Sequence, residues 1–174
     1  MKPLLTFVFS LLLTHCFAQS VLETYKDSVY RFEIGMPSSG WQRVPGTDNY
    51  SPKFILRRLP AGEKDIARES YNLNIINKRT PSSLDQEYDK LVGYLKGTGN
   101  FTMVESGAIT IHDVPVKWFL ENHQNDQDKT VAMTNYVFIA YKDNKTYILT
   151  FATIQSEFKK YRELFDRVAR TLVI

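Results

Sequence analysis

The chain has 174 residues, of which 43% are hydrophobic and 24% are charged, a composition typical of one globular domain. Its 22 basic and 19 acidic residues give a formal net charge of +3. Nucleic-acid binding needs a concentrated basic face, so this near balance predicts no nucleic-acid partner. The single cysteine, Cys16, excludes an internal disulfide framework.

The N-terminus has the three parts of a secretory signal peptide. Lys2 supplies the positive charge, residues 4–13 form an apolar run, and Cys16-Phe-Ala18 supplies the small residues of a cleavage site. The run is too short to span a bilayer, which needs about 20 residues. We therefore predict that residues 1–18 are cleaved and that the mature protein is periplasmic or secreted, with no transmembrane segment. The alternative, a lipoprotein anchored at Cys16, is disfavoured because the bulky His15 precedes it.

The first part of the mature chain is expected to be a flexible lead-in over residues 19–28, followed by a single domain over residues 29–174. Residues 30–34 alternate between apolar and polar side chains, which is the period of a half-buried strand. Turn-forming residues interrupt this alternation before it resumes at residues 41–44.

The middle of the chain is predicted to be a strand pair followed by a helix. Residues 53–59 and 71–77 have strand patterns, and the charged connection over residues 60–69 is expected to be a mobile loop. Ser83 stands three residues before a glutamine, which is a capping box. Leu91 lies on the apolar face of the helix that follows, and we expect it to be buried against a sheet.

The last part of the chain is predicted to be strands and then a second helix. Strand patterns cover residues 101–105, 108–112, 116–122, 130–141 and 147–153, with turns expected at residues 113–115 and 143–144. The second helix begins near Glu157, and Phe165 lies on its apolar face. The order of strands and helices predicts an α+β domain, with helices packed on a mainly antiparallel sheet.

Two local patterns were considered as metal sites. Glu121 and His123 share one face of a strand, but His112 is expected at a hairpin tip more than about 20 Å away, at about 3.3 Å per residue. A zinc centre needs three or four ligands that meet at about 2 Å. The loop over residues 125–128 lacks the glycine and the terminal glutamate of a recognised calcium site. We therefore predict no metal and no cofactor.

Motifs for catalysis are also lacking in the sequence. The chain has no Gly-x-Ser-x-Gly elbow and no glycine-rich phosphate loop before a helix. No catalytic residue is assigned, and the protein is predicted not to be an enzyme. A small periplasmic hydrolase, using carboxylates that the fold brings together, stays open as the alternative.

The candidate partner-binding residues are Trp41, Arg57 and Arg58. Basic side chains gather over residues 53–79, next to the charged loop, and Trp and Arg are enriched at interface hot spots. The alternative interpretation is that Trp41 is part of the core and that the two arginines keep an edge strand soluble.

The opening stretch YRFEIGMPSSGWQRV, residues 30–44, resembles the entry of the PsbP-like family, in which a first strand ends at a proline near a Gly-Trp pair. The segments TPSSLDQEYDKLVGYL, GAITIHDVPVKWFLEN and KTYILTFATIQSEFKKYRELFDRVARTL resemble the helix, hairpin and final strand-helix unit of the same family, so the resemblance spans about residues 25–174. It implies a mainly antiparallel β-sheet sandwiched between α-helices.

The resemblance also implies a function. Known members are mostly non-enzymatic, and they include extrinsic subunits of photosystem II and a Ran-binding relative of the Mog type. No residue of this chain matches the metal or partner sites of either branch. The expected function is therefore that of a non-catalytic exported binding or assembly accessory protein of the cell envelope, whose partner is a protein or another envelope component.

Overall fold

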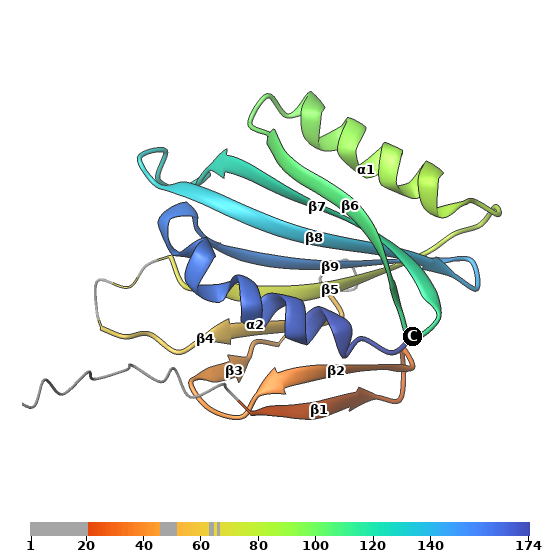
Figure 1. Ribbon diagram of the computed structural model, residues 1–174, viewed down its shortest axis with the longest axis horizontal. Coiled ribbons are helices and arrows are strands. Elements are labelled where there is room, and N and C mark those ends of the chain that lie inside the picture. The colour runs from red at the N-terminus through yellow and green to blue at the C-terminus, as the bar shows by residue number, and fades with distance from the viewer. Residues whose placement is uncertain (1–20, 46–51, 63–64, 66) are drawn as a thin grey trace, which may run out of the picture.

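The computed structural model describes residues 21–45, 52–62, 65 and 67–174. A seven-stranded sheet in the order β3-β4-β5-β9-β8-β7-β6 forms its centre (Figure 1), and all six neighbouring pairs are antiparallel. Its strands are β3 (Trp41–Arg43), β4 (Phe54–Arg58), β5 (Ser70–Asn77), β6 (Thr102–Ile111), β7 (Val114–Gln124), β8 (Ala132–Lys142) and β9 (Lys145–Ile154). The predicted signal peptide lies outside the described residues and stays a prediction.

A separate hairpin of β1 (Leu22–Asp27) and β2 (Phe32–Pro37) precedes the main sheet. The expected lead-in over residues 19–28 is therefore wrong for its central part, which is a strand. The turn is held by Asp27, whose carboxylate accepts hydrogen bonds from the backbone of Val29 and Tyr30 at 2.9 and 2.7 Å. At the other end of the chain, Glu33 and Val173 exchange two backbone hydrogen bonds of 3.0 Å.

The two faces of the sheet are covered by different elements. Helix α2 (Phe158–Arg170) and the β1–β2 hairpin lie on one face, which we name the α2 face. Helix α1 (Leu84–Gly97) packs mainly on β7 and β8 from the opposite side, which we name the α1 face. The predicted α+β architecture, a mainly antiparallel sheet between helices, is confirmed. Neither helix in the described part of the chain is both long and apolar enough to span a membrane.

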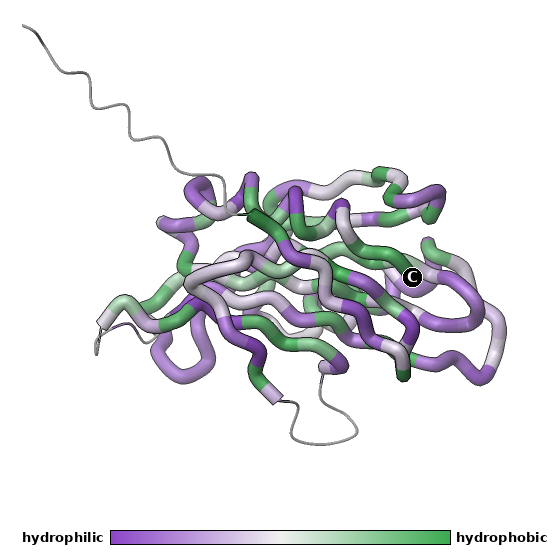
Figure 2. The backbone as a smooth tube through the Cα atoms, turned by 90° about the horizontal axis from the view of Figure 1, so that it is seen from below, coloured by the Kyte–Doolittle hydropathy of each residue, from purple (hydrophilic) through white to green (hydrophobic). Residues whose placement is uncertain are grey.

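Alternation along the strands separates two hydrophobic cores, and Figure 2 shows hydrophobic and hydrophilic segments following one another along the chain. The larger core lies on the α2 face and contains nineteen buried residues, among them Phe165 with no exposed surface. The smaller one lies under α1 and contains four buried residues: Val92, Phe119, Val137 and Ile139.

The predicted burial of the two helices is confirmed for one residue and wrong for the other. Phe165 is fully buried, and its ring stacks on that of Phe151 at 4.8 Å. Leu91 is only half-buried, and Val92, 8% exposed, takes the buried position. The centre of the apolar face of α1 is thus at Val92, one residue after the expected position, and Leu91 lies at the edge of this face.

Two-residue turns join β6 to β7 and β8 to β9. The predicted turn at residues 143–144 is confirmed, with φ values of 49° and 54°. The turn between β6 and β7 lies at His112-Asp113, with φ values of 45° and 64°, and not at residues 113–115 as expected. Val114 and Pro115 instead begin β7 and pair with β6.

The two strands predicted at residues 101–105 and 108–112 form the single strand β6. Gly107 does not break it, because the indole of Trp118 on β7 lies over the glycine; a Cβ atom there would stand 2.8 Å from the ring. A register shift lies between Met103 and Glu105, inside the first of the two predicted strands. The capping box of α1 is confirmed: Ser83 and Gln86 exchange both hydrogen bonds.

Candidate functional site

Trp41 and Arg58 face each other across β3 and β4 on the α2 face. The Trp41 side chain is half-buried, and its ring lies 5.8 Å from that of Tyr71. The Arg58 guanidinium donates two hydrogen bonds of 2.8 and 3.0 Å to Asp65 and also pairs with Glu69. Both candidate residues therefore have structural contacts within the domain.

Arg57 points to the other side of the sheet. It is opposite Gln42 in the ladder and is exposed, whereas its neighbours Leu56 and Arg58 face the main core. The three candidate residues are adjacent in space but do not form one patch. Sequence reasoning placed them together because it did not use the alternation of β4 to assign each arginine a face.

Glu69 is the centre of the ion pairs around Arg58. It is 2% exposed, and Thr153 on β9 donates a hydrogen bond of 3.3 Å to its carboxylate. Asp65 also accepts a bond of 2.7 Å from the backbone of Ala61. The hydrogen bonds from Arg58 hold the pKa of Asp65 below its ordinary value, and in turn Asp65 raises the pKa of the guanidinium. This cluster fastens part of the 60–69 connection to the sheet.

A second buried carboxylate, Glu87, anchors the start of α1. It is 4% exposed and pairs with Lys78 and Lys90. It also accepts hydrogen bonds from Ser82 at 2.6 Å and Thr146 at 2.9 Å. Burial is the largest single influence and opposes the charge, but the bonds from Lys78, Ser82, Thr146 and Lys90 together outweigh it and lower the pKa of Glu87 to about 2.

Sequence reasoning missed this anchor, although a signal was present. Glu87 lies three residues after Leu84 and four before Leu91, so helical periodicity places it on the apolar stripe. An acidic side chain on a buried stripe needs a cationic or hydroxyl partner.

The third buried carboxylate is Glu121 on β7. As predicted, it shares a strand face with His123, and the two side chains are in contact at 3.1 Å. Asn135 on β8 donates a hydrogen bond of 2.6 Å to the Glu121 carboxylate. The hydrogen bond with Glu121 raises the pKa of His123. Among the described residues no cluster of three or more metal-binding side chains surrounds these two.

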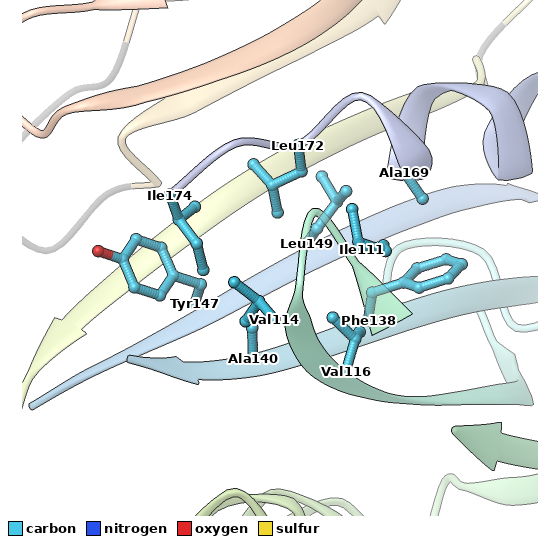
Figure 3. A pocket seen from close by; sticks show the side chains of 10 residues that line it. All are labelled: Ile111, Val114, Val116, Phe138, Ala140, Tyr147, Leu149, Ala169, Leu172 and Ile174. Carbon is cyan, nitrogen blue, oxygen red and sulfur yellow. The ribbon is translucent and has the colours of Figure 1, made fainter. Parts of the chain in front are cut away.

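Two hollows differ in character. The first is an apolar cavity of about 10 Å³, and Figure 3 shows its side chains converging from the β6–β7 turn, from β8 and β9, and from the segment after α2. It has room for one water molecule at most. The second is an open polar hollow of about 220 Å³, lined by Gly99, Asn100, Phe101, Thr102, Asn122, His123, Gln124, Ala132 and Gln155. We name it the polar hollow.

No protein-family model and no curated protein matches the sequence. Solved structures do match. Cyanobacterial PsbP (CyanoP) from Synechocystis sp. PCC 6803 is 16% identical, with a TM-score of 0.63 over 92% of this chain and 95% of that one. LpqN, involved in cell envelope biogenesis of Mycobacterium tuberculosis, is 10% identical, with a TM-score of 0.61 over 88% and 90%. The Ran-binding protein Mog1p of Saccharomyces cerevisiae is 9% identical, with a TM-score of 0.62 over 89% and 96%.

These similarities show that the chain has the PsbP-like fold, as the opening stretch and the order of its elements predict. At such identities they show the fold alone, because one fold serves many functions.

Proposed function

We propose that this protein is a non-catalytic, exported accessory protein of the cell envelope that binds a protein or another envelope component. The observation that carries the proposal is the half of the α1 face that lies beyond α1, over β4, β5 and β9. We name it the open patch and define it by side chains that are half-buried or exposed: Ile55, Arg57, Asn72, Asn74 and Thr150.

The open patch has the properties of a docking surface. A rigid sheet holds its side chains in fixed rows, with Ile55, Asn72 and Thr150 in one row across three strands. It combines an apolar side chain, amides and a hydroxyl with one exposed cation, Arg57. A non-obligate interface is about as apolar as the rest of a protein surface, and this mixture is compatible with one. Of the three candidate binding residues, Arg57 is the one that we retain for partner contact.

Structural neighbours support a binding role. Mog1p is a Ran-binding protein, and LpqN is involved in cell envelope biogenesis. Neither name indicates an enzyme. We extend to this chain only the general role, because no residue carries over from either protein.

The buried acids of the described chain argue against the hydrolase alternative. A pair of catalytic carboxylates must lie within about 5–10 Å of each other. Glu87 bonds to Thr146, whereas Glu121 is level with Ala152, six residues further along β9 and so about 20 Å away. Glu69 lies on the α2 face, and each of the three is held by its own structural partners.

The experiment is site-specific photo-crosslinking in the organism that encodes the protein. A photoreactive side chain at Asn74 or Thr150 should give a discrete cross-linked product, which mass spectrometry identifies. The matched control is the same side chain at Lys159, exposed on α2. Arg57→Glu should weaken binding of the purified product. Equal cross-linking from Lys159, or none from the open patch, would contradict the proposal.

Export is tested separately by the intact mass of the protein recovered from its host. A mature chain that begins at Gln19 is expected. A chain that begins at an acylated Cys16 would make the protein a membrane-anchored lipoprotein, and a chain that retains residues 1–18 in the cytoplasm would contradict export.

A further inference from the structure

The polar hollow lies where β6 begins, β7 ends and β8 begins, beside the single-turn helix over residues 155–157. Its volume of about 220 Å³ is below the roughly 300–1,000 Å³ of pockets that hold drug-sized ligands. A ligand of this site is therefore small, with one ring or a chain of similar size.

The lining offers hydrogen bonds without charge. Four carboxamide side chains line the hollow, and the hydroxyl of Thr102 joins them: Asn100, Asn122, Gln124 and Gln155. His123 is the one ionisable residue among the nine, and its side chain is directed to Glu121 on the other face of β7. A charged ligand would lose hydration there without gaining an opposite charge. Carboxamides both donate and accept, which suits a ligand whose groups also do both.

Part of the lining is held in place before any ligand binds. The Asn100 side chain donates to the backbone oxygen of Gln124 and accepts from its backbone nitrogen, both at 2.8 Å. The Asn122 carboxamide oxygen accepts a bond of 2.7 Å from Thr134, which fixes the orientation of the side chain. Such preorganisation reduces the entropy that a ligand loses on binding.

Other donors and acceptors remain unused. The side-chain amides of Gln124 and Gln155 make no hydrogen bond to any other described residue, and the Asn122 amide nitrogen donates none within this set. Phe101 also lines the hollow, but its ring packs edge-on against Phe119, on the α1 face, at 6.0 Å.

We propose that the polar hollow binds an uncharged, polyhydroxylated ring, such as one sugar unit of an envelope glycan. This inference rests on the proposed binding role and deepens it, since it names the ligand chemistry of one site. The two amides of Gln124 and Gln155 bind the hydroxyls, and Asn122 donates to a further oxygen.

The test is a titration of the ¹⁵N-labelled protein with N-acetylglucosamine and with its β-1,4-linked tetramer, followed by NMR. Saturable shifts are expected in the side-chain amides of Asn122, Gln124 and Gln155 and in the backbone of residues 99–102. In the double variant Gln124→Ala/Gln155→Ala the dissociation constant should rise about fivefold for each lost amide bond. Neither glutamine side chain makes a hydrogen bond to another described residue, and the backbone bonds of Gln124 are retained in alanine, so the variant should stay folded.

The matched control is Gln42→Ala, which removes an exposed glutamine from β3 and should leave the affinity unchanged. Glucuronate, a sugar ring with a carboxylate, should bind more weakly than the neutral sugar. Equal binding of glucuronate, shifts that survive in the double variant, or no saturable shift with either neutral sugar would overturn the inference. A cross-linked partner at the open patch would be unaffected by that failure, so the two proposals fail separately.

Discussion

The two faces of the sheet are held to their helices by different forces. On the α2 face, nineteen buried residues pack together, and Phe165 stacks between Phe151 and Tyr161. On the α1 face, the described hydrophobic core has only four buried residues, but the start of α1 is held by the ion pairs and hydroxyl hydrogen bonds of the buried Glu87. Helix α2 is thus held mainly by apolar area, which is insensitive to pH, whereas the start of α1 is held by a charge.

The largest expected effect is the loss of apolar packing on the α2 face. Phe165→Ala should lower the free energy of unfolding by about 3–5 kcal/mol, because the cavity left in a close-packed core cannot collapse fully. Leu91→Ala on α1 should cost only about 1 kcal/mol, since half of that side chain is already exposed. Denaturant unfolding of both variants measures the difference. Equal losses of unfolding free energy in the two variants would mean that packing on the two faces contributes equally to stability.

The second effect is the dependence of the α1 face on pH. The pKa of Glu87 is about 2 in the folded chain, below the ordinary value of 4.5. Its contribution is therefore complete above about pH 4.5 and is lost as the pH falls towards 2. The fall in pKa corresponds to roughly 3 kcal/mol.

The free energy of unfolding should be measured between pH 7 and pH 2.5. In Glu87→Gln it should depend on pH much less than in the unchanged protein. The control is Glu105→Gln, which breaks an exposed pair with Arg162 and should change stability by less than about 1 kcal/mol. An unchanged pH profile in Glu87→Gln would show that other carboxyls cause the acid sensitivity.

The third effect tests the close contact of Gly107 with Trp118. In Gly107→Ala the added methyl group would stand 2.8 Å from the indole, and the ring cannot move without disturbing Tyr136 beneath it. We expect a loss of about 1–3 kcal/mol, as for other overpacked sites. Tryptophan fluorescence should shift at the same time, because the indole moves. A neutral substitution with unchanged fluorescence would show that the ring adjusts freely.

The smallest effect should be a gain on the α1 face. Gly93 is in the interior of α1, and a Cβ atom there would meet nothing within 4 Å. Gly93→Ala should therefore stabilise the protein by about 0.5–1 kcal/mol through helix propensity alone. Gly99→Ala is the control for backbone conformation. A Cβ atom at Gly99 would also meet nothing within 4 Å, but the φ of 70° should make this substitution destabilising by about 1 kcal/mol. Thermal unfolding of the two variants compares them directly.

Features set by neighbouring residues were predictable from the sequence. The capping box of Ser83 and Gln86 is a spacing of three residues, and the turn at residues 143–144 depends on side chains that tolerate positive φ. Features set by distant residues were not. Strand β1 has a polar sequence, and it is held by packing of Tyr25 against Phe54 and by Arg43 over the Tyr25 ring.

The candidate site shows the same limit. The charge of Arg58 is balanced by Glu69 and Asp65, which the fold places beside it. The register of β4 with β5 determines that these side chains are close together. The sequence contains these charges but not the register, so the arginine pair was predicted to be a single basic surface. Alternation along β4 alone would have placed Arg57 and Arg58 on opposite faces of the sheet, once Phe54 and Leu56 were recognised as its buried residues.

The bridge between Glu33 and Val173 also has a consequence for the order in which the protein forms. A ribosome makes the β1–β2 hairpin first, but its backbone bonds to Val173, and the bond of 2.7 Å from the Gly35 nitrogen to Thr171, need residues made 136 or more positions later. Contacts so far apart close a long loop and form late. The earliest segment of the domain can contact Arg43 and Phe54 soon after its synthesis, but its bonds to residues 171 and 173 must wait until α2 has been synthesised.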